Sequence, residues 1–225
     1  MAVKSTFDFD QMLSSAREAY AEELMRMADE GLDFAFTYSD NVAPSSSAGK
    51  LVAKYPERCF NFGIAEPGQV GAACGMALAA KLDHRDYRVY TLIGDGESEE
   101  GQVWEACMFA GAKKLDNLVV ILDNNNLQID GPVSEVNNPY PFDKKFEAFN
   151  FHVICIDGND FDQLRAAFKE ARETKGMPTA IVAKTLKGKG VSYMEDAVDW
   201  HGKAPNDEQY EIAMKDLEKI GEELA

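Results

Sequence analysis

Two short polar segments of the chain carry residue types that could bind a divalent cation and a phosphate group. The first, GDGE at residues 94–97, follows an apolar run that is typical of a β-strand. Gly94 and Gly96 permit tight dihedral angles and a close approach of a phosphate, and the Asp95 carboxylate is a hard oxygen ligand for magnesium. The second segment, DNNNL at residues 123–127, follows the next apolar run along the chain.

Magnesium prefers an octahedral shell of oxygen atoms, which proteins usually share with phosphate groups and water. The protein ligands that we predict are the Asp95 carboxylate, the Asn125 amide oxygen and the backbone carbonyl of Leu127. Each segment alone also fits an ordinary tight turn or polar loop, because Gly, Asp and Asn are common in turns. Their occurrence after two successive predicted strands favours a metal and diphosphate site.

Apolar runs of β type alternate with stretches of helical periodicity along the chain. The expected strands cover residues 33–38, 59–62, 87–93, 118–122, 152–156 and 179–184. The expected helices cover residues 8–29, 45–54, 67–82, 97–114, 142–150 and 161–174, with a last one from residue 206. This alternation predicts an α/β fold with a three-layer, doubly wound parallel sheet. Ligands of such sheets bind outside the carboxyl ends of the strands, where both polar segments would lie.

The composition limits the size of the fold and the kinds of partner. A chain of 225 residues with 45% hydrophobic content is expected to form one large α/β domain. Its net charge of −16 repels nucleic acid and anionic membranes, so we expect neither as a partner. We find no signal sequence and no apolar run of membrane-spanning length. The cysteines lack metal-ligand spacing, so we expect small buried residues in a reduced, cytoplasmic protein: Cys59, Cys74, Cys107 and Cys155.

The stretch GDGESEEGQVWEACMFAGAKKLDNLVVILDNNNLQIDG resembles the diphosphate-binding motif of transketolases. The resemblance covers residues 83–225 and includes KTLKGKG at 184–190 and WHG at 200–202. It implies a thiamine-diphosphate-binding fold in which Mg²⁺ is held by Asp95, Asn125 and the Leu127 carbonyl. The residues that it places along thiamine diphosphate are Glu66, Gly94, Asp95, Gly96, Glu97, Asn125, Leu127, Ile129 and His201.

His201 resembles a transketolase histidine that reaches both the diphosphate and the substrate end of the pocket, so the resemblance implies a catalytic role. Ile129 would pack near the thiazolium ring of the cofactor. A histidine in an exposed loop is the alternative interpretation of His201, because polar residues commonly lie in such loops.

Residues 1–80 resemble another part of the same family, the first half of the transketolase pyrimidine-binding domain. The segments that carry this resemblance are AREAYAEELMRMADEGLDFAFTYSD and YPERCFNFGIAEPGQVGAACGMALA. The order is inverted relative to the family, so residues 1–225 are predicted to form one hybrid domain, diphosphate-domain-like over 81–225, and to be an engineered or recombined chimera. Glu66 of GIAEP matches the catalytic glutamate that hydrogen-bonds the aminopyrimidine ring. A helix N-terminal charge is the alternative for Glu66.

The resemblance implies a thiamine-diphosphate- and magnesium-dependent transferase that moves a two-carbon ketol unit between sugar phosphates. A homodimer would place Glu66 of one chain opposite Asp95 and Asn125 of the other. Because several family segments are missing, a noncatalytic hybrid scaffold that dimerises and at most binds the cofactor is a second hypothesis, and a separate partner chain could complete the pocket. A Rossmann-type dehydrogenase is disfavoured, since no GxGxxG follows the first predicted strand.

Overall fold

A computed structural model of the chain describes residues 16–39, 42 and 46–224. Six parallel strands form its main sheet, in the order β2-β1-β3-β4-β8-β7. The strands are β1 (Phe34–Tyr38), β2 (Cys59–Asn61), β3 (Arg88–Gly94), β4 (Leu118–Asn124), β7 (His152–Asp157) and β8 (Thr179–Lys184). The central strands β3 and β4 are almost wholly buried, as expected for a sheet covered on both faces.

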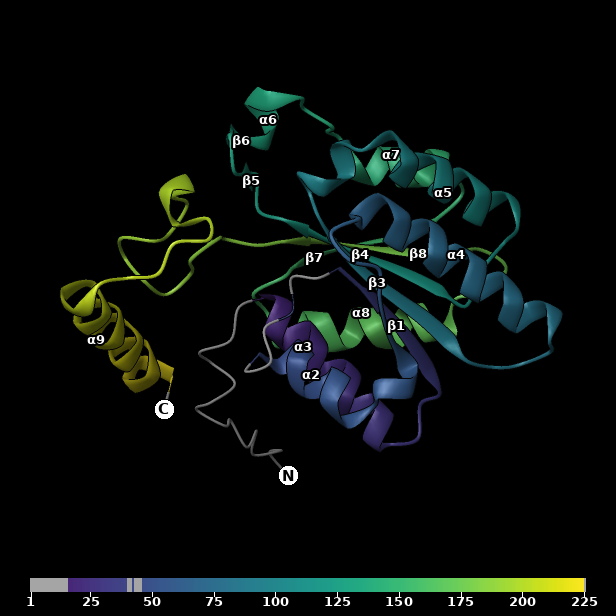
Figure 1. Ribbon diagram of the computed structural model, residues 1–225, viewed down its shortest axis with the longest axis horizontal. Helices are drawn as coiled ribbons and strands as arrows, with labels where there is room; N and C mark the ends of the chain where they lie inside the picture. Colours follow the sequence, from purple (N-terminus) through teal and green to yellow (C-terminus); the bar gives the residue numbers. More distant parts are fainter. Residues whose placement is uncertain (1–15, 40–41, 43–45, 225) are drawn as a thin grey trace.

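Helices cover both faces of this sheet (Figure 1). One face carries α2 (Ala16–Asp29), α3 (Ser47–Lys54) and α8 (Phe161–Glu173), and the other carries α4 (Glu66–Leu82), α5 (Gly101–Ala112) and α7 (Phe142–Ala148). Aromatic side chains such as Tyr20, Tyr90 and Phe168 fill the first layer of core. The second layer contains many Ala, Val and Cys residues, which lets α4 and α5 pack closely on the strands. The three-layer, doubly wound parallel sheet predicted from the sequence is confirmed.

The strand order reverses direction between β1 and β3. The chain runs outward from β1 to the edge strand β2, then returns through α4 to β3 on the other side of β1. Such a reversal leaves a crevice outside the carboxyl ends of the two strands, which is where open α/β sheets bind their ligands. The fold therefore places a natural binding position beside the end of β3.

Several elements differ from the sequence-based expectation. The predicted helix 97–114 is divided into a 3₁₀ turn, η2 (Glu97–Glu99), and α5. A small hairpin of β5 (Leu127–Gln128) and β6 (Gly131–Pro132), followed by α6 (Val133–Val136), was not predicted, because two-residue strands have no hydrophobic periodicity to reveal them. Of the predicted helix 8–29, only the part from Ala16 onward lies within the described residues.

The C-terminal segment extends beyond the sheet (Figure 1). It contains the 3₁₀ turn η3 (Val198–Trp200) and the helix α9 (Asp207–Leu224); the remaining 3₁₀ turn, η1 (Pro56–Arg58), precedes β2. The helix α9 packs on the loop after β8, where the Tyr193 hydroxyl donates to the Gln209 carbonyl at 2.8 Å and the Ser192 hydroxyl donates to Asp216 at 2.6 Å.

The helix α5 lies close to the backbone at Phe149, and this contact tests how tightly the helix packs. A Cβ atom at Gly111 would lie 1.7 Å from the Phe149 carbonyl oxygen, whereas one at Gly75 of α4 would meet no atom within 4 Å. We expect Gly111→Ala to lower the free energy of unfolding by roughly 1–3 kcal/mol through overpacking. Gly75→Ala, the matched control, should raise it by roughly 0.5–1 kcal/mol through helix propensity. Urea denaturation measures both, and equal effects would contradict this packing.

Candidate functional site

The two polar segments identified in the sequence meet at the carboxyl edge of the sheet. The strands β3 and β4 are neighbours, with Ile93 opposite Leu122 and Gly94 opposite Asp123. One further hydrogen bond extends this pairing beyond β3, because the backbone N–H of Asp95 donates to the carbonyl of Asp123 at 3.1 Å. The register of the two strands therefore brings residues 94–97 beside residues 123–127.

The Asp95 carboxylate is the most unusual group at this edge, because its residue is only 1% exposed. One oxygen accepts the backbone N–H of Gly96 at 2.9 Å, and the other accepts the backbone N–H of Asn126. Across the described part of the chain, no Lys or Arg side chain forms an ion pair with it. Burial raises the pKa of Asp95 to about 6; the Asn126 hydrogen bond opposes this rise, and the nearby Asp123 carboxylate adds to it.

The turn that follows β4 holds the other two predicted metal ligands near Asp95. Asn126 adopts a left-handed backbone conformation with φ of 62°, which asparagine tolerates better than most residues. The side-chain oxygen of Asn125 accepts the backbone N–H of Leu127 at 3.0 Å and so fixes the turn. Because the Asn126 N–H is bonded to the Asp95 carboxylate, Asn125 and Leu127 flank the residue that contacts it.

The oxygens of this site fit a magnesium ion chemically. Carboxylate and amide oxygens each have more than one lone pair, so they can accept a hydrogen bond and still bind a cation. A buried carboxylate without a cationic partner is also the group that a divalent ion would stabilise most. Among the described residues, no group of three or more His, Cys, Asp or Glu could hold a metal. The predicted ligand set needs only one carboxylate, so it does not depend on such a group.

The glycines of the first segment act differently from the prediction. Gly96 has ordinary helical dihedral angles, with φ of −64° and ψ of −38°, so the expected tight dihedral is wrong at this position. Its missing side chain matters for space instead, since a Cβ atom would lie 2.9 Å from the Cβ of Gln128. Gly94 ends β3, and its backbone N–H donates to the Glu97 carboxylate at 2.9 Å, which closes the turn.

Two residues that were not predicted from the sequence, Asp123 and Thr185, join the strand ends next to the site. Asp123 is 9% exposed, and its carboxylate accepts the Thr185 hydroxyl at 2.5 Å. The backbone N–H of Thr185 also donates to the Asn124 carbonyl at 3.1 Å. Thr185 thereby connects the end of β8 to the end of β4. Both residues lie inside the sequence segments DNNNL and KTLKGKG, which is the signal that could have found them.

The remaining predicted site residues lie outside the two segments that meet at Asp95. Glu66 is half-buried in the first turn of α4 and follows the edge strand β2, which β1 separates from β3. Its carboxylate forms neither a hydrogen bond nor an ion pair with another described residue. Ile129 is 74% exposed in the hairpin turn, and the exposed His201 lies in the segment that extends beyond the sheet. A single chain therefore brings the predicted metal ligands together, while Ile129 and His201 are exposed and Glu66 is half-buried.

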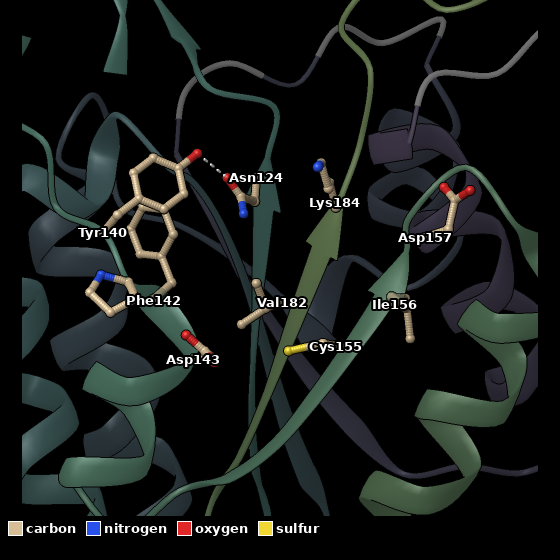
Figure 2. Close-up of a pocket in the computed structure, with 10 residues that line it drawn as sticks. Asn124, Tyr140, Phe142, Asp143, Cys155, Ile156, Asp157, Val182 and Lys184 are labelled. Carbon is tan, nitrogen blue, oxygen red and sulfur yellow. Dashed lines mark hydrogen bonds between the residues drawn. The ribbon is translucent and has the colours of Figure 1, made fainter. Parts of the chain in front are cut away.

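A shallow cavity of about 370 Å³ lies beside the site, against the ends of β4, β8 and β7 (Figure 2). The Tyr140 hydroxyl donates to the Asn124 side chain at 2.6 Å at one side, Lys184 of β8 lies in the middle, and Ile156 and Asp157 of β7 lie at the other side. None of the predicted site residues lines this cavity. Cys155, which does, is exposed on the edge strand β7, so the prediction of a buried side chain is wrong for this cysteine.

The chain matches the family described as transketolase, thiamine diphosphate binding domain, over residues 63–220. The chain belongs to the transketolase family. This match covers α4 as well as the elements from β3 onward, and the predicted division near residue 80 stays a prediction. The matched range contains all of residues 94–97 and 123–127.

Relatives within the transketolase family are longer than this chain. A 6-deoxy-6-sulfo-D-fructose transketolase subunit from Clostridium sp. (strain MSTE9) is 45% identical over 150 residues, which are 67% of this chain and 54% of that protein. An apulose-4-phosphate transketolase subunit from Phocaeicola vulgatus is 41% identical over 67% of this chain and 53% of its own length. The chain thus spans about half the length of these curated relatives.

The solved structure of transketolase from Campylobacter jejuni subsp. jejuni NCTC 11168 superposes with a TM-score of 0.61 and 35% identity. The superposition covers 66% of this chain and 24% of that one. It supports the same family fold for the sheet and its helices. Within the described ranges, no helix is long and apolar enough to cross a bilayer.

The raised pKa of Asp95 should make stability depend on pH. Its folded-state pKa of about 6 lies above the ordinary value of 3.8, so the folded chain binds this proton more tightly than the unfolded chain. The stability that protonation contributes is present at low pH and is lost as the pH rises through 6. Without divalent cations, the free energy of unfolding of the wild type minus that of Asp95→Asn should increase by about 1 kcal/mol from pH 7 to pH 5.

Urea denaturation at both pH values measures this difference. The matched control is Asp130→Asn, which removes an exposed carboxylate from the turn of the same hairpin and so measures the effect of losing a surface charge. A constant difference for Asp95→Asn would show that Asp95 is not the group whose pKa is raised by burial.

Proposed function

We propose that this chain binds thiamine diphosphate through a magnesium ion held by Asp95, Asn125 and the Leu127 carbonyl, and that it takes part in two-carbon ketol transfer between sugar phosphates. The observation that carries the proposal is the Asp95 carboxylate, which is 1% exposed and, among the described residues, bonded only to backbone N–H groups. Its position at the carboxyl edge, within the family match, supports a metal role over a purely structural turn.

Thiamine diphosphate, when bound, supplies the carbon nucleophile of such a transfer. The chain's own residues would bind and orient it. Gly94, Gly96 and Glu97 would lie along the diphosphate. The metal ion would offset the negative charge of the diphosphate, which the net charge of −16 on the chain would otherwise repel. Ile129 would offer an apolar contact to the thiazolium ring.

We further propose that a complete site requires two chains. Glu66 would hydrogen-bond the aminopyrimidine ring from one chain while Asp95 binds the metal in the other. Three observations support this arrangement: Glu66 follows the edge strand β2, the match spans only about half the length of the two curated relatives, and both of those relatives are named as subunits. A homodimer uses the chain for both roles, with residues 1–80 supplying the pyrimidine part and residues 81–225 the diphosphate part.

His201 would contact the substrate end of the pocket once the C-terminal segment is covered by the second chain. Its exposed position beyond the sheet supports a role that depends on another chain. The described cysteines form no disulfide, which favours a reducing compartment such as the cytoplasm.

A noncatalytic scaffold is the second candidate function. The exposure of Ile129 and His201 favours it, because both side chains face solvent within one chain. In this case the chain would dimerise and at most bind the cofactor, and measurements of turnover separate the two candidates.

Isothermal titration calorimetry tests the binding site. We expect the wild type to bind thiamine diphosphate only when Mg²⁺ is present. Asp95→Ala should weaken this binding by at least about a hundred-fold, because it removes the only carboxylate of the ligand set. Asp130→Ala, which removes an exposed carboxylate from the neighbouring turn, should bind as the wild type does. Folded wild type that binds no cofactor, or undiminished binding by Asp95→Ala, would overturn the proposal.

A mixing experiment tests the shared site and the role of Glu66. Glu66→Gln and Asp95→Ala should each be inactive in ketol transfer from a ketose phosphate to an aldose phosphate. Random pairing of an equal mixture places one intact Glu66 opposite one intact Asp95 in half of the dimers. The mixture should therefore regain about a quarter of the wild-type activity.

The control for this experiment is Glu57→Gln, which changes an exposed glutamate before β2 and should keep full activity. No recovery on mixing would contradict a site shared between two copies. An active Glu66→Gln would identify Glu66 as a helix N-terminal charge, and an inactive wild type that still binds the cofactor would support the scaffold.

A further inference from the structure

Gln69 is a buried polar residue in the small, apolar helix α4, and it is 2% exposed. The two N–H groups of its side chain are shared among three acceptors, the Thr91 hydroxyl at 2.8 Å, the Leu92 carbonyl at 3.0 Å and the Thr37 carbonyl at 3.1 Å. Its side-chain oxygen accepts the Ser39 hydroxyl at 2.8 Å. One glutamine therefore contacts both β1 and β3 at their carboxyl ends.

These contacts lie where the two strands separate. The last paired residues of β1 and β3 are Thr37 and Thr91, whereas β3 continues beside β4 as far as Gly94. Beyond this point β1 and β3 are no longer paired, and the buried amide of Gln69 contacts the Thr37 carbonyl of one strand and the Leu92 carbonyl of the other. Gln69 thus occupies the crevice at which the strand order reverses.

The end of β3 that Gln69 fixes is the end that carries Asp95. Leu92, which accepts a hydrogen bond from Gln69, lies three positions before Asp95 in the chain. The Asp95 carboxylate must meet the turn after β4 with its two backbone contacts intact. A shift of the β3 end toward β1 would move the carboxylate away from Asn125 and Leu127.

We propose that Gln69 is a positioning residue for the metal and diphosphate site, holding the crevice between β1 and β3 open and setting the place of Asp95. This inference rests on the proposed function of the site. Gln69 does not contact the metal; it acts through the backbone of β3. Partners that orient the ligands of a metal typically change its affinity by about 10- to 100-fold when they are removed.

A half-buried amide, that of Asn117, provides a control at the opposite end of the same elements. The Asn117 side chain donates to the Ala77 carbonyl of α4 at 3.0 Å and to the Tyr87 carbonyl, just before β3, at 3.4 Å. It joins the same helix to the same strand, but at the amino edge of the sheet. Asn117→Leu should therefore lower stability without moving Asp95.

The experiment compares Gln69→Met, Gln69→Glu and Asn117→Leu with the wild type, by urea denaturation and by calorimetric titration of thiamine diphosphate at fixed Mg²⁺. Gln69→Met keeps the length of the side chain but loses its donors, and Gln69→Glu keeps the shape if Gln69→Met fails to fold. We expect a dissociation constant at least ten-fold higher for the Gln69 variants and within about two-fold of the wild type for Asn117→Leu.

Gln69 variants that are folded and bind as tightly as the wild type would overturn the inference, while the proposed function would stand. An equal loss of affinity in Asn117→Leu would also overturn it, since the effect would then follow stability alone. Absence of Mg²⁺-dependent binding by the folded wild type would instead refute the proposed function, and the inference with it.

Discussion

Burial of one carboxylate at the end of two parallel strands is the constraint on which the rest of this structure depends. Asp95 is 1% exposed and bonded to backbone N–H groups on both of its oxygens. Keeping such a group ionised costs free energy, which explains why burial raises its pKa to about 6. The register of β3 and β4, the left-handed Asn126 and the space left by Gly96 all serve to hold the residues that surround it.

Much of the architecture could be predicted from the sequence because its strands are continuous apolar runs. The buried strands β3 and β4 and the polar segments after them were found in this way, and their meeting at one edge follows from the parallel sheet. The hairpin of β5 and β6 could not be found, since its strands have two residues each. The exposure of Cys155 was also missed, because an apolar run does not reveal that its strand is at an edge.

The candidate site was predictable only in the part that is local in sequence. Asp95, Asn125 and Leu127 are linked by one strand pair and one turn, so motif and register suffice to place them together. Gln69 acts across the sheet through contacts with β1 and β3, and no short motif records such contacts. In the proposed dimer, Glu66 and His201 would reach the site from a second chain, and no motif within one chain records such a contact.

The proposed role of Asp95, Asn125 and the Leu127 carbonyl is to hold a divalent cation for thiamine diphosphate. The most direct test of this role is a crystal of the chain grown with thiamine diphosphate and Mn²⁺ in place of Mg²⁺, with the metal located by anomalous scattering. We predict one peak per chain in contact with all three residues, at roughly 2.0–2.3 Å from their oxygens. A bound cofactor whose metal lies elsewhere, with the Asp95 carboxylate still bonded only to Gly96 and Asn126, would contradict this role.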